Sequence, residues 1–221
     1  MRAIVKFSKG EGVKYISHLD VLRLFQRAVL RAELPVSYSQ GYNPHMLIGF
    51  ACALPVGVIS SAEYMELKLA QEIAEEKLSD RLNAVLPAGI AVLRVKAVPE
   101  AGPSLAAMIR AAKYELAFER MTEELAGLPQ RVLEQDQIMI EKKSKKGVKL
   151  TDIRGMVREL SQQGNCLTCE LTAGNEENLR PDVFWSYLKT LLESSQETPR
   201  ICRTAQLILQ DGMLCDAMEL H

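Results

Sequence analysis

Residues 17–32 read SHLDVLRLFQRAVLRA, and this stretch decides the fold. Ser17 with Asp20 three residues later resembles a capping box, with Asp in place of Glu, and predicts that a helix begins here. Apolar side chains recur through the stretch at helical spacing, so they should form one face buried against a core. The expected buried residues are Leu22, Phe25, Val29 and Ala32.

Strands and helices alternate on both sides of this helix. A strand over residues 2–7 precedes it, with alternate apolar side chains on one face. The expected elements that follow are a short strand at 36–38, strands at 47–53 and 63–69, a helix at 71–85 and a strand at 90–98. The main elements have the order β-α-β-β-α-β, which is that of the ferredoxin-like fold.

A second, weaker series of elements follows the linker-like segment from Pro99 to Pro103. Its expected members are a strand at 113–118, a helix at 122–128, a hairpin of 132–142 with 148–153, a helical turn at 153–160, a strand at 165–172, a helix at 181–192 and a strand at 200–209. We therefore expect an α+β fold of two tandem ferredoxin-like (βαββαβ) units with antiparallel sheets. The first occupies residues 1–100 and the second, divergent unit residues 104–221.

Bulk composition restricts the class of protein. A chain of 221 residues can bury a sizeable core, and a formal net charge of −1 excludes a global field that attracts nucleic acid. The first 50 residues nevertheless hold seven Lys or Arg against three Asp or Glu, so a polyanion contact should be local. There is neither a bilayer-length apolar run nor a signal-peptide apolar region, and the five cysteines form no even framework. We expect a cytoplasmic protein that contacts no membrane.

Residues 15–50 carry polar, aromatic and cationic groups at high density, which indicates a recognition or catalytic surface. Arginines spaced four apart on the predicted helix suit phosphate binding, although a solvated helix face is an equal interpretation. Tyrosines in the loop after the helix could stack on bases, or they could simply pack. The candidate ligand- or RNA-binding residues are His18, Asp20, Arg23, Arg27, Arg31, Tyr38, Gln40, Tyr42, Asn43 and His45.

His18 and His45 are also candidates for catalysis, because imidazole titrates near neutrality and a pair could act as general base and acid on a ribose hydroxyl. Two histidines alone are weak evidence for that chemistry, and lining a binding pocket is the favoured role. We therefore assign no catalytic residue in the primary hypothesis.

Two further motifs point to weaker hypotheses. Lys142, Lys143, Lys145 and Lys146 form a basic hairpin tip that could grip a nucleic-acid backbone or simply prevent strand pairing. Cys166 and Cys169 have the spacing of metal and redox sites, but strand alternation should point the two thiols apart, and no second pair follows. We expect no metal and no cofactor.

Several segments together resemble one known family. They are 15–20 (YISHLD), 27–35 (RAVLRAELP), 38–45 (YSQGYNPH) and 53–57 (ALPVG), with looser similarity at 152–154, 180–181 and 203–204. They closely resemble the radical SAM-linked protein family, a bacterial family whose domain has no established function. The resemblance implies a link to cobalamin-type radical SAM enzymes and, through neighbouring genes, to RNA or ribosome work. This chain lacks the three closely spaced cysteines of a radical SAM cluster, so the resemblance implies an accessory part.

The primary hypothesis is therefore an accessory RNA-binding adaptor that works with a radical SAM enzyme in RNA or ribosome-related modification. The expected partners are that enzyme and RNA, with no DNA. One alternative is a metal-independent RNA-processing endoribonuclease that uses His18 and His45. Another is a protein–protein docking module that does not contact RNA. Whether the protein is an enzyme is left open, and the adaptor is preferred.

Overall fold

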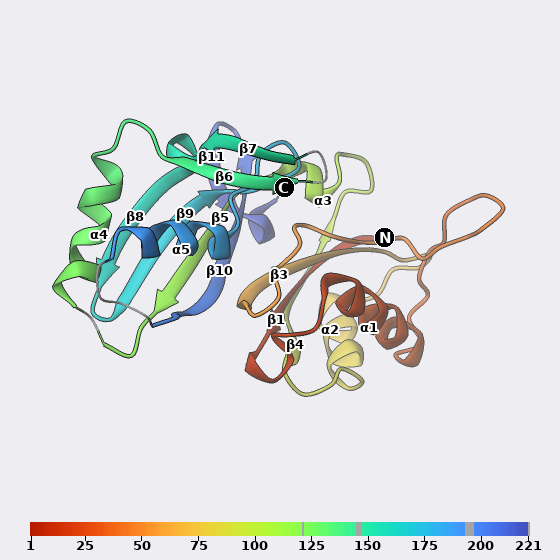
Figure 1. The fold of residues 1–221 in the computed structure, drawn as a ribbon. Coiled ribbons are helices and arrows are strands. Elements are labelled where there is room, and N and C mark those ends of the chain that lie inside the picture. Colours follow the sequence, from red (N-terminus) through yellow and green to blue (C-terminus); the bar gives the residue numbers. More distant parts are fainter. Residues whose placement is uncertain (121, 145–146, 193–196, 221) are drawn as a thin grey trace.

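The computed structural model describes residues 1–120, 122–144, 147–192 and 197–220, without the side chains of residues 142–144. It has a mixed α+β fold with a mostly antiparallel sheet, and its two halves lie side by side in Figure 1. The coarse fold class expected from the sequence is confirmed.

The N-terminal half places two helices on one face of its strands (Figure 1). Its elements are β1 (Arg2–Lys9), α1 (His18–Arg31), β2 (Ile48–Phe50), β3 (Ile59–Lys68), α2 (Glu75–Asn83) and β4 (Ile90–Val98). Strand β1 is central and pairs antiparallel with both β3 and β4, while the short β2 pairs antiparallel with β3. The strands thus lie in the order β4-β1-β3, with β2 beside β3.

The C-terminal half has the same alternation with a hairpin inserted. Its elements are α3 (Leu105–Met108), β5 (Ile109–Ala117), α4 (Glu123–Leu133), β6 (Met139–Ser144), β7 (Gly147–Asp152), β8 (Val157–Gln163), β9 (Cys166–Thr172), α5 (Pro181–Thr190), β10 (Arg200–Gln210) and β11 (Met213–Asp216). The order of the main strands is β10-β5-β9-β8, all antiparallel. Within the described residues, β6 and β7 form a separate two-stranded sheet.

A short parallel contact joins the two halves into one nine-stranded sheet. Cys202 and Arg203 of β10 pair with Ile59 and Ser60 of β3. The C-terminal segment strengthens the joint, because Asp216 accepts hydrogen bonds from Lys6 Nζ at 3.1 Å and from Tyr64 Oη at 2.7 Å. The predicted domain boundary between Pro99 and Pro103 stays a prediction. This segment lies in a loop whose carbonyls accept hydrogen bonds from Arg2.

Two apolar clusters stabilise the molecule. One lies between α1, α2 and the helix side of the N-terminal sheet, and includes Val5, Phe7 and Phe25. The other fills the C-terminal half and extends under the N-terminal sheet, where Ile4 belongs to it. Both faces of β1 are therefore buried, whereas the sequence analysis considered only the face of Ala3, Val5 and Phe7.

The first helix agrees closely with expectation at its start and only partly in its buried face. Ser17 caps it by accepting a hydrogen bond from the backbone N–H of Asp20. Phe25 and Val29 are buried as predicted, but Leu22 is only half-buried, and Val21 and Ala28 take its place. The prediction that Leu22 is buried was wrong, because packing in the N-terminal cluster turns the Val21 side of the helix towards the sheet.

Other differences lie where local patterns are ambiguous. The expected strand at 36–38 forms only isolated bridges, and the helix expected from residue 71 begins at Glu75. Val132, expected to begin a strand, is buried in the last turn of α4, because apolar side chains at 125, 128 and 132 recur at helical spacing. The helical turn expected at 153–160 covers only 154–156 before β8 begins. Strand β11 was not predicted.

Candidate functional site

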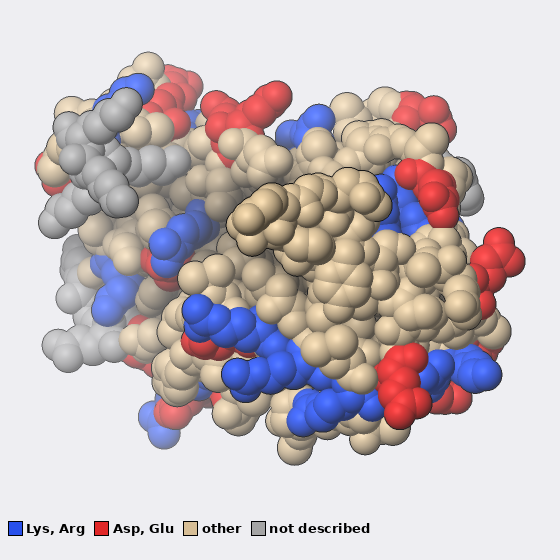
Figure 2. Space-filling view, turned by 90° about the vertical axis from the view of Figure 1, so that its right-hand side faces the viewer, with Lys and Arg blue, Asp and Glu red and all other residues tan. Residues whose placement is uncertain are grey.

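One face of α1 forms the wall of an open surface groove of about 570 Å³. The opposite wall is the turn between α2 and β4, which contributes Val85 and Pro87. The arginines expected to share one helix face do line this groove together, namely Arg23, Arg27 and Arg31. Figure 2 views the molecule from the side of this half and shows Lys and Arg side chains in a row below a broad uncharged surface.

Polar contacts order the end of the groove where α1 begins. Ser17 Oγ donates a hydrogen bond to Asp20 Oδ2 at 2.6 Å, and Arg23 Nη1 donates to Asp20 Oδ1 at 3.1 Å. The hydrogen bond from Ser17, helped by Arg23, lowers the pKa of Asp20. Asp20 therefore stays ionised at neutral pH and holds Arg23 in place.

The other two arginines differ in what holds them. Arg31 Nη2 donates to the carbonyl oxygen of Val85 at 3.0 Å, which fixes it across the groove. Within the part of the chain that the structure describes, the exposed Arg27 makes no hydrogen bond and no ion pair. The groove thus presents one available guanidinium group between two that are positioned by protein atoms.

The loop after α1 carries five more of the predicted site residues and does not line the groove. Ser39 and His45 close it: the backbone N–H of Ser39 donates to the carbonyl of His45 at 2.9 Å, and Ser39 Oγ bonds His45 Nδ1 at 2.8 Å. Tyr42 is fully exposed at 101% and Tyr38 is 44% exposed. Gln40, Asn43 and His45 are exposed in the same loop.

His18 lies elsewhere, in a narrow recess with Phe50, Lys9 and Glu63. Its ring meets Phe50 edge-on, with 5.4 Å between ring centroids. Among the described residues the two imidazoles of His18 and His45 share neither a hydrogen bond nor a ring contact. The structure therefore gathers the arginines, while His18 packs on Phe50 and His45 bonds Ser39 within its own loop.

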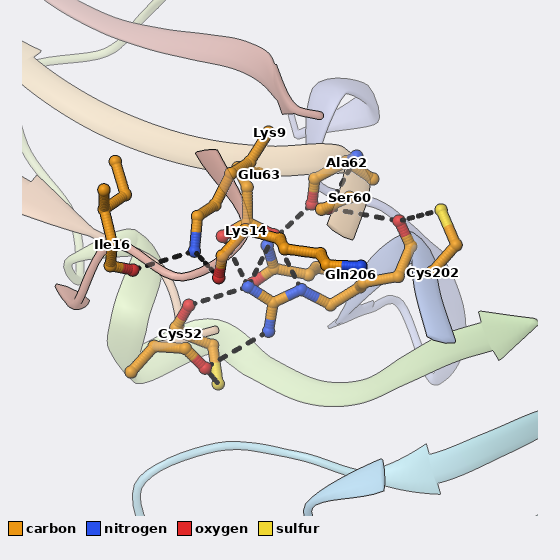
Figure 3. Close-up of polar contacts among 11 residues, drawn as sticks. Lys9, Lys14, Ile16, Cys52, Ser60, Ala62, Glu63, Cys202 and Gln206 are labelled. Carbon is orange, nitrogen blue, oxygen red and sulfur yellow. Dashed lines mark hydrogen bonds and ion pairs between the residues drawn. The ribbon is translucent and has the colours of Figure 1, made fainter. Parts of the chain in front are cut away.

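A buried ion pair occupies the joint between the halves (Figure 3). Arg203 of β10 is fully buried, and its Nε and Nη2 donate to Glu63 Oε1 at 2.8 and 2.6 Å. Its Nη2 also donates to the carbonyl of Cys52 at 3.0 Å. Burial lowers the pKa of Arg203, but the Glu63 carboxylate together with Tyr114 and Cys52 outweighs burial, so the pKa is raised overall.

Lys9 adds a second cation to this buried region and is only 2% exposed. Its Nζ donates to the carbonyls of Lys14 at 3.1 Å and Ile16 at 3.0 Å (Figure 3). Burial lowers the pKa of Lys9, and the nearby Glu63 only partly opposes that shift. The sequence analysis missed this cluster, since Arg203 and Glu63 are 140 positions apart and no local pattern connects them.

Sequence analysis also missed the apolar surface of the groove, to which Ile16 and Leu24 contribute. The apolar residues Ile16 and Leu24, close in sequence to the arginines, could have indicated it. The opposite wall could not be foreseen, because it depends on how α1 packs against the turn at Val85.

The thiols of the C-x-x-C motif have different surroundings. Cys169 is buried in the C-terminal cluster, while Cys166 is half-buried. Burial raises the pKa of both thiols, so both stay protonated at neutral pH and are poor metal ligands and nucleophiles. The described residues contain no group of three or more His, Cys, Asp or Glu placed to hold a metal ion.

The predicted basic tip lies largely outside the described residues, which exclude Lys145 and Lys146 and the side chains of Lys142 and Lys143. The described backbone confirms the hairpin beneath it, with Met139 opposite Asp152 and Ser144 opposite Gly147. Across the described part of the chain, no helix has the length and apolar character needed to cross a bilayer.

The groove is carried by an α+β domain with a mostly antiparallel sheet. The chain belongs to the family described as "Uncharacterized protein conserved in bacteria (DUF2344)", whose sequence model matches residues 2–181. This confirms membership of a bacterial family whose function is not established, and the link to radical SAM enzymes stays a prediction.

Comparison with other proteins adds a distant likeness. No curated protein matches the chain. Among solved structures, 21 chains match, one of them in the "Crystal Structure of a Cbf5-Nop10-Gar1 Complex". That chain has 10% sequence identity and a TM-score of 0.48, and the match covers 92% of this chain and 48% of that one. The present chain thus spans about half the length of its match.

Proposed function

We propose that this chain is a non-catalytic adaptor that binds RNA in the arginine groove and presents it to a radical SAM enzyme. The observation that carries the RNA part is the state of Arg27. Among the described residues it is exposed and unpaired between Arg23 and Arg31, which protein atoms hold in place. An unpaired guanidinium group beside two ordered ones is suited to an anion that arrives from outside.

The arrangement suits a chain of phosphates better than one small anion. Four residues of helix rise about 6 Å, so guanidinium groups four apart stand in a row rather than around one point. Forked donors in a row match successive phosphates along a nucleic-acid strand, and such contacts position the strand without reading its bases. The loop residues Tyr42 and Asn43 stay the proposed base contacts, because both are exposed and available for stacking or hydrogen bonding.

The partner enzyme rests on the resemblance to the radical SAM-linked family. The chain contributes five cysteines, of which only Cys166 and Cys169 are closely spaced, so the cluster chemistry would belong to the partner. We also propose the finer description of the fold as two ferredoxin-like units. Its support is the strand order β4-β1-β3 with β2 beside β3 in one half, and the corresponding order β10-β5-β9-β8 in the other.

The alternative, a metal-independent endoribonuclease, needs His18 and His45 at one phosphodiester. Their separate surroundings favour the adaptor: His18 packs on Phe50, and His45 bonds Ser39 within its own loop. RNA cleavage without added metal that His18→Ala abolishes would support the alternative.

Binding of a fluorescently labelled RNA of random sequence, measured by anisotropy across a salt series, tests the proposal. Phosphate contacts release counterions, so affinity should fall steeply with salt. Arg27→Ala should weaken binding to all sequences and reduce the slope of log affinity against log salt by about one. The matched control is Arg131→Ala, which removes an exposed helical arginine on α4, outside the groove.

Equal slopes for Arg27→Ala and the wild-type protein would contradict the groove. If the wild-type protein shows no salt-dependent RNA binding while a partner protein co-purifies after nuclease treatment, the docking-module alternative would replace the adaptor.

A further inference from the structure

A large aromatic side chain stands exposed in the turn just before α1. Tyr15 is 74% exposed, and the next residue, Ile16, lines the groove. Tyr15 was not among the residues assigned to the site from sequence. A ring this exposed contributes little to packing, so most of its surface is available to a ligand.

The backbone on both sides of Tyr15 is held by hydrogen bonds from the protein interior. The buried Lys9 donates to the carbonyls of Lys14 and Ile16, the two neighbours of Tyr15 (Figure 3). The carbonyl of Lys14 also accepts a hydrogen bond from the backbone N–H of Gly57 at 2.9 Å. Three hydrogen bonds therefore hold a short exposed turn, and a buried charge supplies two of them.

The ring itself is also positioned. Lys14 Nζ lies 5.3 Å from the ring centroid, within the range of a cation–π interaction. Gly57 lies beside the edge of the ring, since a Cβ there would be 3.9 Å from Tyr15 Cε1. Lys14 is itself held by Glu11 at 2.8 Å. A pre-positioned aromatic ring one residue from the lining of an arginine groove offers a stacking platform beside a path for phosphates.

We propose that Tyr15 is a base-stacking platform and that the groove takes single-stranded rather than double-stranded RNA. This inference rests on the proposed RNA-binding function. A base can lie on Tyr15 only if it is unstacked and unpaired, because a duplex presents phosphates at its surface but hides the faces of its bases. Phosphates of the same strand then follow α1 from Arg23 towards Arg31.

The decisive experiment separates stacking from charge. Anisotropy is measured with a single-stranded RNA, the same RNA annealed to its complement, and ATP as a free nucleotide. We expect the single strand to bind much more tightly than either the duplex or ATP. Tyr15→Ala should weaken single-strand binding by about 5- to 150-fold, the range for loss of one stacked base. It should leave the salt slope unchanged, since tyrosine carries no charge.

Tyr15→Trp keeps the platform and supplies a second readout. It should retain affinity, and its indole fluorescence should be quenched by the single strand. The native Trp185 is only 5% exposed in the C-terminal cluster and gives a constant background. Circular dichroism checks that Tyr15→Ala remains folded, which is expected because the side chain is exposed.

Equal affinity for single strand and duplex, unchanged binding by Tyr15→Ala, or ATP binding as tight as the oligonucleotide would each overturn the inference. The first two leave the proposed function standing if Arg27→Ala still lowers the salt slope. Absence of RNA binding by the wild-type protein overturns both.

Discussion

Two sets of cations in this molecule have opposite surroundings. At the joint between the halves, Arg203 and Lys9 are buried, and they donate hydrogen bonds to Glu63 and to backbone carbonyls. On the open face of α1, the arginines stand in water, and Arg27 has no partner among the described residues. Sequence alone does not separate the two sets, since each consists of isolated positive residues and the partners of the buried set lie far along the chain or on backbone atoms.

The difference teaches how to separate structural cations from functional ones. A buried charge needs compensation to avoid a large desolvation penalty, so its partners belong to the fold. An exposed cation is solvated by water and needs no protein partner, so its N–H donors remain available to a ligand. Mutations should therefore separate the two sets, with stability responding to one and binding to the other.

The largest expected effect is at Arg203. Arg203→Met leaves the Glu63 carboxylate buried without its partner, and loss of one member of a buried pair costs about 3–5 kcal/mol of unfolding free energy. Urea denaturation followed by circular dichroism measures it. Adding Glu63→Leu should recover part of the loss, because the unpaired charge is then removed. A single variant as stable as the wild-type protein would show that the pair does not hold the joint.

A smaller effect is expected at Lys9. Lys9→Met removes two hydrogen bonds but also a desolvated charge, so we expect a loss of about 1–2 kcal/mol near neutral pH. Because burial lowers the folded-state pKa of Lys9 below its unfolded value, the unfolded chain binds more protons between these two pKa values. The contribution of Lys9 to stability should therefore rise as the pH rises through this window towards 10.5.

The difference in unfolding free energy between the wild-type protein and Lys9→Met, measured at several pH values above 7, isolates the contribution of Lys9. The contributions of the other titrating groups are common to both proteins and cancel. A difference that shrinks as the pH rises would contradict the assignment. Lys9→Met should also loosen the turn that presents Tyr15.

The smallest stability effect is expected on the open face. Arg27→Ala removes an exposed side chain with no partner among the described residues, so unfolding free energy should change by no more than about 0.5 kcal/mol. Thermal unfolding of the variant and the wild-type protein measures this. A loss comparable with that of Arg203→Met would mean that the groove arginines are structural, and the contrast between the two sets would fail.

Local patterns predicted the parts of the molecule that local forces determine. The cap at Ser17, the length of α1 and the common face of its arginines follow from residues a few positions apart. The partners across the fold could not be foreseen: Val85 opposite Arg31, and Glu63 opposite Arg203. Leu22 shows the same limit, because the rotation of an amphipathic helix by one position depends on what it packs against.

The late position of Arg203 has a consequence for synthesis on the ribosome. The N-terminal strands can pair as soon as β4 emerges. The ion-pair partner of Glu63, however, is translated 140 residues after it. Domains generally form from the N-terminus as the chain grows, so the underside of the first sheet, with Ile4 and Tyr64, stays uncovered meanwhile. The Glu63 carboxylate lies on the opposite face of β3, beside Phe7 and Val21. Arrival of β10 therefore completes two things at once, the ion pair on one face and the apolar cover on the other.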